Sequence, residues 1–163
     1  MELSPACVSE LENASASVPE FSLNGKRIHG KVVACYDGDT FHAVIHLMNG
    51  LMKFNCRMAG YDTPEMKPPA NKPGRELEKQ RALIAKQALL SKVCDGIDIS
   101  GVYTKYELDE LVKYNKKIIV LECEEFDKYG RLLVRVPMQG NSTVNDWMIA
   151  NGYGYAYNGG TKQ

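Results

Sequence analysis

Two stretches of alternating residues, joined by a short turn sequence, constrain the fold of this chain more than any other feature. Every second residue is apolar from Phe41 to Leu47, and again from Met52 to Met58. Successive side chains of a β-strand point to opposite faces, so this period of two predicts strands that each bury one face. Met48-Asn49-Gly50 supplies the turn residues of a β-hairpin between them. Together with a preceding strand, the predicted meander consists of residues 31–36, 40–47 and 51–58.

The remaining chain adds two strands and two or three helices. In the longest helix, Leu77, Ile84 and Ala88 share one stripe, which we expect to face the core. In the last helix, Thr143 is the expected N-cap and Gly152 follows the C-terminal end. The predicted strands are residues 117–124 and 131–138, and the predicted helices are residues 75–92, 106–114 and 143–151. This order predicts a β-rich α+β fold, compatible with a small Greek-key barrel.

Charge is distributed unevenly along a chain whose net charge is zero. The 163 residues balance 20 Lys and Arg against 20 Asp and Glu, which excludes the strongly basic class of nucleic-acid coat proteins. Residues 1–24 hold four Glu and no basic residue. This composition predicts a flexible acidic segment with one short helix, and the functional alternative is a docking tail. One domain is expected at residues 25–163. Residues 67–92 are rich in Lys and Arg, which indicates either a solvated helix face or a nucleic-acid contact.

The cysteines and the hydropathy pattern indicate where the chain resides. Five cysteines, without a CxxC spacing, lie mostly in apolar or alternating stretches and predict buried free thiols rather than disulfides or a zinc site. The N-terminus has neither a basic region nor an apolar core of the kind that signal peptides carry, and no stretch approaches the roughly 20 apolar residues of a membrane span. We therefore expect a cytoplasmic protein with no membrane partner.

Four polar blocks each lie where a predicted strand begins, ends or turns, and these are positions where a rigid sheet can hold reactive groups. Taken singly, the DGDT, DTPE and DKYGR sequences are better explained as an ordinary turn, a helix-entry or capping device and a charged hairpin tip. The blocks are DGDT at 37–40, Arg57, DTPE at 62–65 and DKYGR at 127–131.

The side chains of these blocks are chemically complementary. Asp39 and Asp62 offer hard oxygen ligands, and the Thr63 carbonyl adds a third, a set that suits Ca²⁺ or Mg²⁺. Glu65 is a candidate base for a metal-associated water. Two arginines, Arg57 and Arg131, provide planar forks that match phosphate oxygens and neutralise charge at phosphorus. Two acids, one base and two arginines form a set suited to phosphodiester cleavage.

In this order, the blocks VVACYDGDT, RMAGYDTPE, FDKYGR and TVNDWMIANG resemble the staphylococcal nuclease (thermonuclease) family from about residue 32 to residue 152. The resemblance implies an OB-fold, a five-stranded Greek-key barrel with two to three packed helices, and Ca²⁺-dependent cleavage of DNA and RNA. It also implies a role for each matching residue. Those residues are Asp39, Asp62 and the Thr63 carbonyl at the metal, Glu65 as general base, Arg57 and Arg131 at the phosphate, Lys128 and Tyr129 at a neighbouring phosphate, and Asp37 and Thr40 beside the metal ligands.

The chain departs from the family pattern in three places. The hairpin between Asp39 and Arg57 is longer, and an insertion near residues 95–115 is expected either to shape substrate access or to bind a partner. The family continues past the equivalent of Gly152 into base-stacking tyrosines and a final helix, whereas this sequence reads YGYAYNGGTKQ and ends, so we expect that helix to be missing. The alternating tyrosines Tyr153, Tyr155 and Tyr157 then have two possible roles, which are stacking bases and covering the barrel.

The leading hypothesis is a monomeric, Ca²⁺-dependent, sugar-nonspecific nuclease that hydrolyses DNA and RNA by in-line attack of a metal-associated water. The alternative is a noncatalytic nuclease-like module that binds nucleic acid or a protein partner. The neutral net charge favours the module, because tight nonspecific binding normally needs more positive surface. Retention of both carboxylates and both arginines favours the enzyme.

Overall fold

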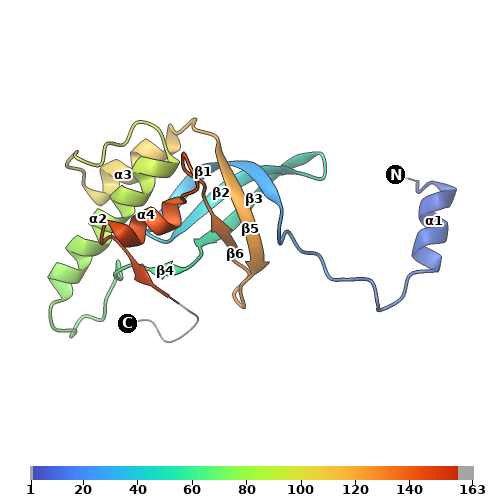
Figure 1. Cartoon of the computed structure of the whole chain (residues 1–163), viewed down its shortest axis with the longest axis horizontal. Helices are drawn as coiled ribbons and strands as arrows, with labels where there is room; N and C mark the ends of the chain where they lie inside the picture. Colours follow the sequence, from blue (N-terminus) through green and yellow to red (C-terminus); the bar gives the residue numbers. More distant parts are fainter. Residues whose placement is uncertain (1, 158–163) are drawn as a thin grey trace.

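The computed structural model describes residues 2–157 and is built around a closed barrel (Figure 1). Around the barrel the strand order is β1-β2-β3-β6-β5; β3 and β6 run parallel and the other neighbours antiparallel. This topology confirms the expected α+β fold with a five-stranded OB barrel. The strands are β1 (Arg27–Asp37), β2 (Thr40–Leu47), β3 (Gly50–Met58), β5 (Ile119–Phe126) and β6 (Leu132–Arg135).

The β2–β3 hairpin forms where the alternation predicts it. Met48 and Asn49 both have positive φ, at 52° and 65°, as a two-residue turn of the mirror-image type requires. Phe41 and Ile45 point into the barrel and are buried. The expectation that Met52 also faces the core is wrong, because its side chain is 38% exposed. In β3 the pairing with β6 begins only at Cys56, so Met52 lies beyond the end of the neighbouring strand.

Three helices pack against the barrel: α2 (Arg75–Val93), α3 (Lys105–Lys113) and α4 (Val144–Ala150). The face of α2 that meets the core differs from the expected stripe, since Leu77 and Ile84 are 51% and 54% exposed. Its buried residues include three alanines, which allow close approach to the barrel. The buried residues of α2 are Ala82, Ala85, Lys86, Ala88, Leu89, Leu90 and Val93.

Lys86 is the main exception to the prediction of an exposed basic helix. Its side chain is fully buried, and its Nζ lies 2.6 Å from Oδ1 of Asp109 on α3. This ion pair joins α2 to the segment between residues 95 and 115. A capping box at Thr104 and Glu107 begins α3, and Leu108 lies in the core. Helix α3 begins and ends one residue before the expected 106–114 stretch. It packs on α2 and β1.

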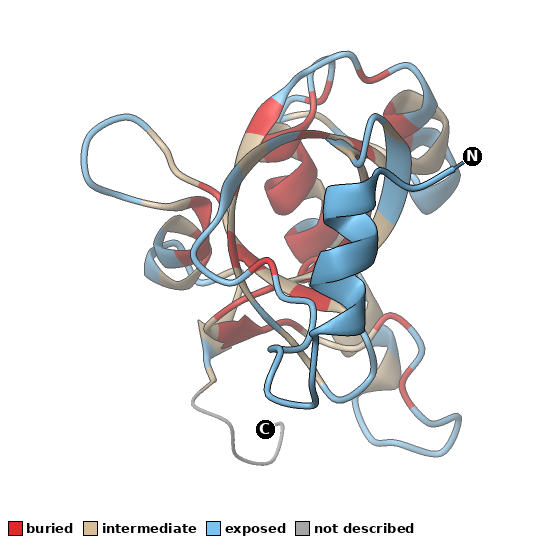
Figure 2. Cartoon of the chain, turned by 90° about the vertical axis from the view of Figure 1, so that its right-hand side faces the viewer, coloured by how far each residue is buried: buried red, intermediate tan, exposed pale blue. Residues whose placement is uncertain are grey.

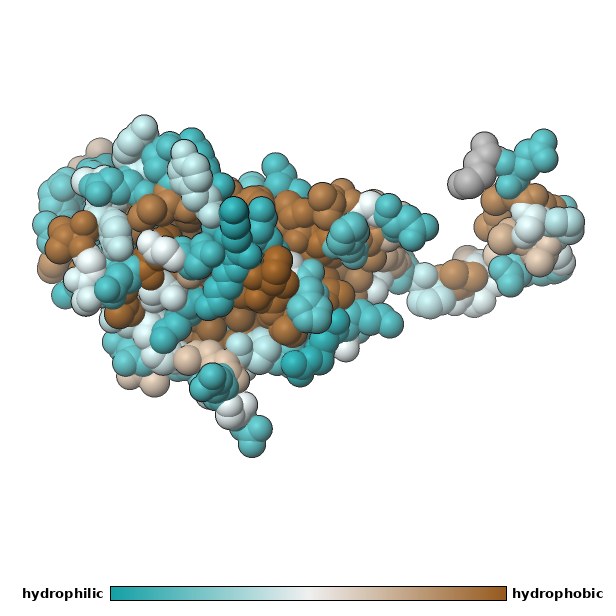
Figure 3. All heavy atoms as spheres, turned by 90° about the horizontal axis from the view of Figure 1, so that it is seen from above, coloured by the Kyte–Doolittle hydropathy of each residue, from teal (hydrophilic) through white to brown (hydrophobic). Residues whose placement is uncertain are grey.

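The N-terminal segment contains the expected short helix, α1 (Pro5–Glu12), which begins at the N-cap Ser4. No residue of α1 is buried, and Figure 2 shows the helix entirely in the exposed colour in front of the barrel. Figure 3 shows it separated from the main body by an extended segment, with hydrophobic and hydrophilic atoms side by side. The first buried residue along the chain is Leu23.

All five cysteines are free thiols, as expected, but they differ in burial. Cys56, Cys94 and Cys123 are buried, Cys35 is half-buried, and Cys7 on α1 is exposed, contrary to the expectation for buried thiols. Burial raises the pKa of Cys56 and of Cys94 to about 12. Among the helices of the described part of the chain, none combines the length and apolarity needed to cross a bilayer.

A second, two-stranded sheet lies beside the barrel and joins β4 (Tyr61–Asp62) to β7 (Tyr155–Ala156). Thr143 caps α4 as predicted, because its side chain accepts a hydrogen bond from the Asp146 backbone N–H. Gly152 follows the helix with a φ of 77°, a conformation that favours glycine. The end of the YGYAYNGGTKQ stretch, residues 158–163, lies outside the described residues.

Candidate active site

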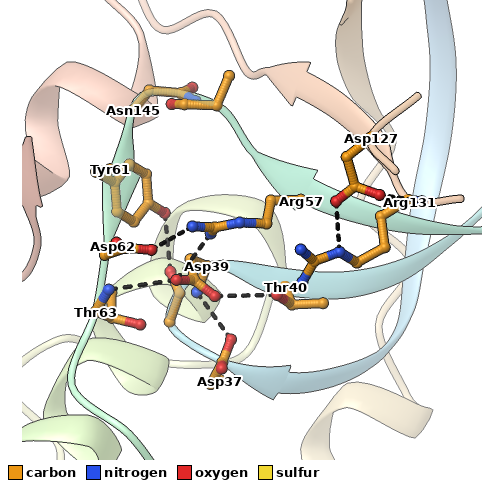
Figure 4. A network of polar contacts seen from close by, with 12 residues as sticks. Asp37, Asp39, Thr40, Arg57, Tyr61, Asp62, Thr63, Asp127, Arg131 and Asn145 are labelled. Atoms are coloured by element: carbon orange, nitrogen blue, oxygen red, sulfur yellow. Dashed lines mark hydrogen bonds and ion pairs between the residues drawn. The ribbon is translucent and has the colours of Figure 1, made fainter. Parts of the chain in front are cut away.

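The polar blocks converge on one open cleft of about 1210 Å³. The β1–β2 turn, the end of β3, the segment after β4 and the β5–β6 loop all contribute to it, so residues far apart in sequence meet at one end of the barrel (Figure 4). No residue of the 95–115 segment lines the cleft. The lining includes Asp37, Asp39, Thr40, Arg57, Asp62, Glu65, Lys128, Tyr129 and Arg131.

Arg57 lies at the centre of the site and bridges the two candidate metal ligands. Its Nη1 lies 2.8 Å from Oδ2 of Asp39, and its Nη2 is paired with Oδ1 of Asp62. The three side chains are only 11%, 5% and 4% exposed. Burial lowers the pKa of Arg57, but the two carboxylates outweigh it and the net pKa is raised, so the guanidinium stays charged.

A network of short contacts holds the Asp39 carboxylate in place. Its Oδ1 accepts a hydrogen bond from Oγ1 of Thr40 at 3.0 Å, and its Oδ2 accepts one from the Thr63 backbone N–H at 3.3 Å. The Asp39 backbone N–H in turn donates to Oδ1 of Asp37 at 3.1 Å. Asp37 and Thr40 therefore contact Asp39 directly and position it.

Tyr61 connects the DGDT turn to the DTPE segment. The buried Tyr61 hydroxyl donates a 2.8 Å hydrogen bond to the carbonyl of Gly38. Burial, followed by the nearby charge of Asp39, raises the pKa of Tyr61 well above its ordinary value, so the hydroxyl remains a donor. Gly38 is itself tightly enclosed, since a Cβ there would lie 2.8 Å from Ala85 Cβ and 2.8 Å from Thr63 Cγ2. Sequence patterns did not indicate this role for either residue.

Asp127 organises the opposite side of the cleft. Its carboxylate accepts hydrogen bonds from the backbone N–H groups of Tyr129 and Arg131, both at 2.9 Å, and from Nε of Arg131 at 2.7 Å. Burial raises the pKa of Asp127, but the hydrogen bonds with Arg131 and Tyr129 outweigh it and the net pKa is lowered. Lys128 and Tyr129 are exposed on this turn, and Arg131 lies over the Tyr129 ring at 5.4 Å.

Two features test whether the site suits a hard cation. Oδ2 of Asp62 is buried and has no hydrogen-bond partner among the described residues, so it is an acceptor available to an ion. No cluster of three or more His, Cys, Asp or Glu side chains suited to a metal is present in residues 2–157, so a cation at Asp39 and Asp62 would need further oxygens from backbone, hydroxyl, water or substrate. An all-oxygen set of this kind fits Ca²⁺, which takes six to eight oxygens, many of them non-carboxylate.

The tyrosines at the end of the described chain lie in three different places. Tyr153 packs on Trp147, with 5.4 Å between ring centroids, and so covers α4. Tyr157 lines the cleft, with its ring 5.9 Å from the Arg57 guanidinium, and Tyr155 pairs with Asp62 through β7. Glu65 also lines the cleft, and its backbone N–H donates to the Glu78 carboxylate at 3.2 Å.

Comparison with known proteins identifies the family. The pattern described as staphylococcal nuclease homologue matches residues 55–163, more than half of the chain. The chain belongs to this family. No curated protein matches the sequence significantly. The matched region of the staphylococcal nuclease homologue begins within β3 and leaves out Asp39, but the ion pair between Asp39 and Arg57 connects the unmatched β1 and β2 directly to the matched site.

Proposed function

We propose that this protein is a Ca²⁺-dependent, sugar-nonspecific nuclease that hydrolyses phosphodiester bonds of DNA and RNA. One observation carries the proposal: two buried carboxylates and two arginines, from four separate segments, meet in a single open cleft. Family membership supports a nucleic-acid substrate. The Ca²⁺ requirement and the chemistry rest on the side chains themselves.

Asp39, Asp62 and the carbonyl of Thr63 are the proposed calcium ligands. When bound, the ion supplies positive charge to the scissile phosphate and orients the attacking water. Glu65 is the proposed general base, which accepts a proton from the water as it attacks phosphorus in line with the leaving oxygen. Its position on the cleft wall, after Pro64, is consistent with this role.

Arg57 and Arg131 are the proposed phosphate ligands. Planar guanidinium groups bind two phosphate oxygens at once and stabilise the charge that develops on them. Asp127 holds Arg131 through its Nε, which leaves the Nη atoms of the guanidinium for the substrate. Arg57 exchanges at least one carboxylate contact for a phosphate oxygen when substrate binds. Lys128 and Tyr129, exposed at the cleft rim, contact a neighbouring phosphate.

The test is cleavage of single-stranded DNA, duplex DNA and RNA by the purified chain with Ca²⁺, with Mg²⁺ and with chelator. We expect Ca²⁺-dependent cleavage of all three, which Asp39→Asn abolishes and Arg131→Ala slows by about 10² or more. Arg27→Ala is the matched control, because Arg27 is an exposed arginine whose partner, Glu122, lies outside the cleft. Binding without cleavage in every metal would instead identify a noncatalytic module, which the neutral net charge favours.

The proposal includes a monomer in a reducing, cytoplasmic compartment, supported by five free thiols. Light scattering during size-exclusion chromatography measures the oligomeric state. A dimer at micromolar concentration would contradict this part of the proposal.

A further inference from the structure

We infer that the outer face of β1, β2 and β3 is a track that binds a single-stranded nucleic acid extending away from the cleavage site. The inference rests on the proposed function and adds a second phosphate-binding region to it. This region is separate from Lys128 and Tyr129, which lie on the β5–β6 turn. We call it the lysine row, and it consists of Lys31 on β1 and Lys53 on β3.

The cleft already continues onto this face. Its lining includes Tyr36, His42 and Asn55, which lie on three adjacent strands. His42 pairs in register with Asn55 on one side and with Ala34 on the other. Ala34, His42 and Asn55 are therefore the next row of the sheet after Thr40 and Arg57, on the same outward face, and Tyr36 lies at the register shift between Cys35 and Asp37. The opening around the catalytic groups is thus continuous with the sheet surface.

The lysine row is the row after that. Lys31 pairs with Val44, and Val44 pairs with Lys53, so the two lysines flank one apolar residue across three strands. Lys53 is exposed and Lys31 half-buried, and neither forms an ion pair with any described residue. Many basic residues elsewhere have carboxylate partners, such as Lys72 with Glu78. An unpaired cationic row is what a polyanion needs.

The three strands carry acids only at the catalytic end. Between residues 26 and 58 the acidic residues are Asp37 and Asp39, and both belong to the site itself. The basic residues of the same stretch are Lys26, Arg27, Lys31, Lys53 and Arg57. Arg57 is paired with Asp39 and Asp62, and Arg27 with Glu122, so the positive charge of this face that has no carboxylate partner among the described residues includes the lysine row, beyond the cleavage site along the hairpin.

The dimensions fit a strand longer than a dinucleotide. Side chains four residues apart on β3, at Lys53 and Arg57, share one face and lie about 13 Å apart along the strand. OB folds bind roughly 4–16 nucleotides of single-stranded nucleic acid. Tyr36 is 52% exposed at the cleft and offers a ring for base stacking, which requires an unpaired base. The exposed ring therefore favours a single strand over a duplex.

The test compares Lys31→Glu/Lys53→Glu with a charge-matched control, Lys105→Glu/Lys116→Glu. Both control lysines are exposed and lie outside the cleft. Binding of a fluorescent oligothymidylate of about 20 nucleotides is measured by anisotropy in chelator, over a range of salt concentrations. We expect the lysine-row variant to bind about tenfold or more weakly, with a salt slope lower by about 1.4, as expected for two lost phosphate contacts on a single strand. The control variant should match the wild type.

A second measurement uses kcat/KM in Ca²⁺ for the same oligonucleotide and for a dinucleotide ester. The lysine-row variant should lose far more activity on the long substrate than on the short one. If the lysine-row variant loses equal kcat/KM on both substrates, or if its salt slope equals that of the control variant, the proposed track is overturned. If the lysine-row variant loses as much binding to a duplex as to a single strand, the proposal that the track binds single-stranded nucleic acid is overturned.

The two proposals fail in different ways. If the wild type binds but never cleaves, the nuclease proposal fails while the salt slope still tests the lysine row. If the wild type cleaves and the lysine-row variant cleaves the long substrate as the control does, the track fails and the nuclease proposal stands. Circular dichroism of both double variants confirms that each is folded.

Discussion

Replacing Asp109 by Ala should destabilise the protein far more than replacing its partner, Lys86. Lys86 is fully buried, and its ammonium has one hydrogen bond among the described residues, the 2.6 Å contact to Asp109. The Asp109 side chain is 43% exposed. Asp109→Ala therefore leaves a buried charge unpaired, whereas Lys86→Met leaves a carboxylate that water can reach.

The expected magnitudes follow from this asymmetry. Removing one partner of a buried ion pair costs about 3–5 kcal/mol, and the partial exposure of this pair places Asp109→Ala near the lower end, at about 3 kcal/mol. For a chain of this size that lowers Tm by about 6–12 °C. Lys86→Met should change the free energy of unfolding by less than about 1 kcal/mol, because a buried apolar chain replaces a desolvated cation.

Urea unfolding of the two single variants and the double variant provides the measurement. The double variant should resemble Lys86→Met, with a coupling energy of about 2 kcal/mol or more. Glu110→Ala is the matched control, because Glu110 pairs with Lys113 at 2.7 Å on the same helix but in solvent, and its loss should cost less than about 0.5 kcal/mol. If Asp109→Ala is no worse than this control, burial of Lys86 does not govern the pair, and the reasoning is refuted.

Three further predictions concern the site and the thiols. Gly38→Ala should lower the free energy of unfolding by about 1–3 kcal/mol and should lower kcat by about tenfold or more. The reason is that the new Cβ forces the turn away from Ala85 and displaces Asp39. An unchanged kcat together with a wild-type Tm would contradict this prediction. The pKa of Asp127 is lowered below its ordinary 3.8 in the folded state, so its stabilisation is present above about pH 4 and is lost as pH falls through the folded pKa. Asp127→Asn should therefore destabilise the protein at neutral pH, with a difference from wild type in urea unfolding that shrinks below about pH 4; a pH-independent difference would argue against it. In native protein, a thiol reagent should label Cys7 rapidly and Cys56, Cys94 and Cys123 only on unfolding, since Cys7 is exposed and those three thiols are buried; mass spectrometry of the labelled peptides distinguishes this from uniform labelling.

Local chemistry explains what could be predicted from the sequence. The β2–β3 hairpin depends on a period of two and on a turn that accepts positive φ, both of which are visible in consecutive residues. The cap of α4 depends on Thr143 and its near neighbours. The candidate site residues were assigned from the chemistry of the polar blocks and from resemblance, and the structure brings all of them except Thr63 into the lining of one cleft. Their catalytic and metal-binding roles remain predictions.

The errors arise where side chains meet across long sequence separations. The buried face of α2 was misassigned because Leu77 looks apolar in any window, whereas the barrel surface admits alanines at close range and the first turns of the helix, with Leu77, stay in solvent. Lys86 was counted as a surface charge because its partner lies 23 residues away on another helix. Tyr61 and Gly38 were overlooked because their hydrogen bond closes a turn only in the folded chain.

The sequence by itself determined the strands of the hairpin, the caps, the turn glycines and the identity of the polar blocks, because these depend on residues within one turn or one strand of each other. Only the tertiary structure decided that Arg57 bridges Asp39 and Asp62, that one oxygen of Asp62 has no hydrogen-bond partner within residues 2–157, and that the acid-free face of three strands begins at the cleft. These features require barrel closure, which brings the ends of separate strands together and removes them from water. In the protein interior, charge interactions and hydrogen bonds are strong enough to organise a site.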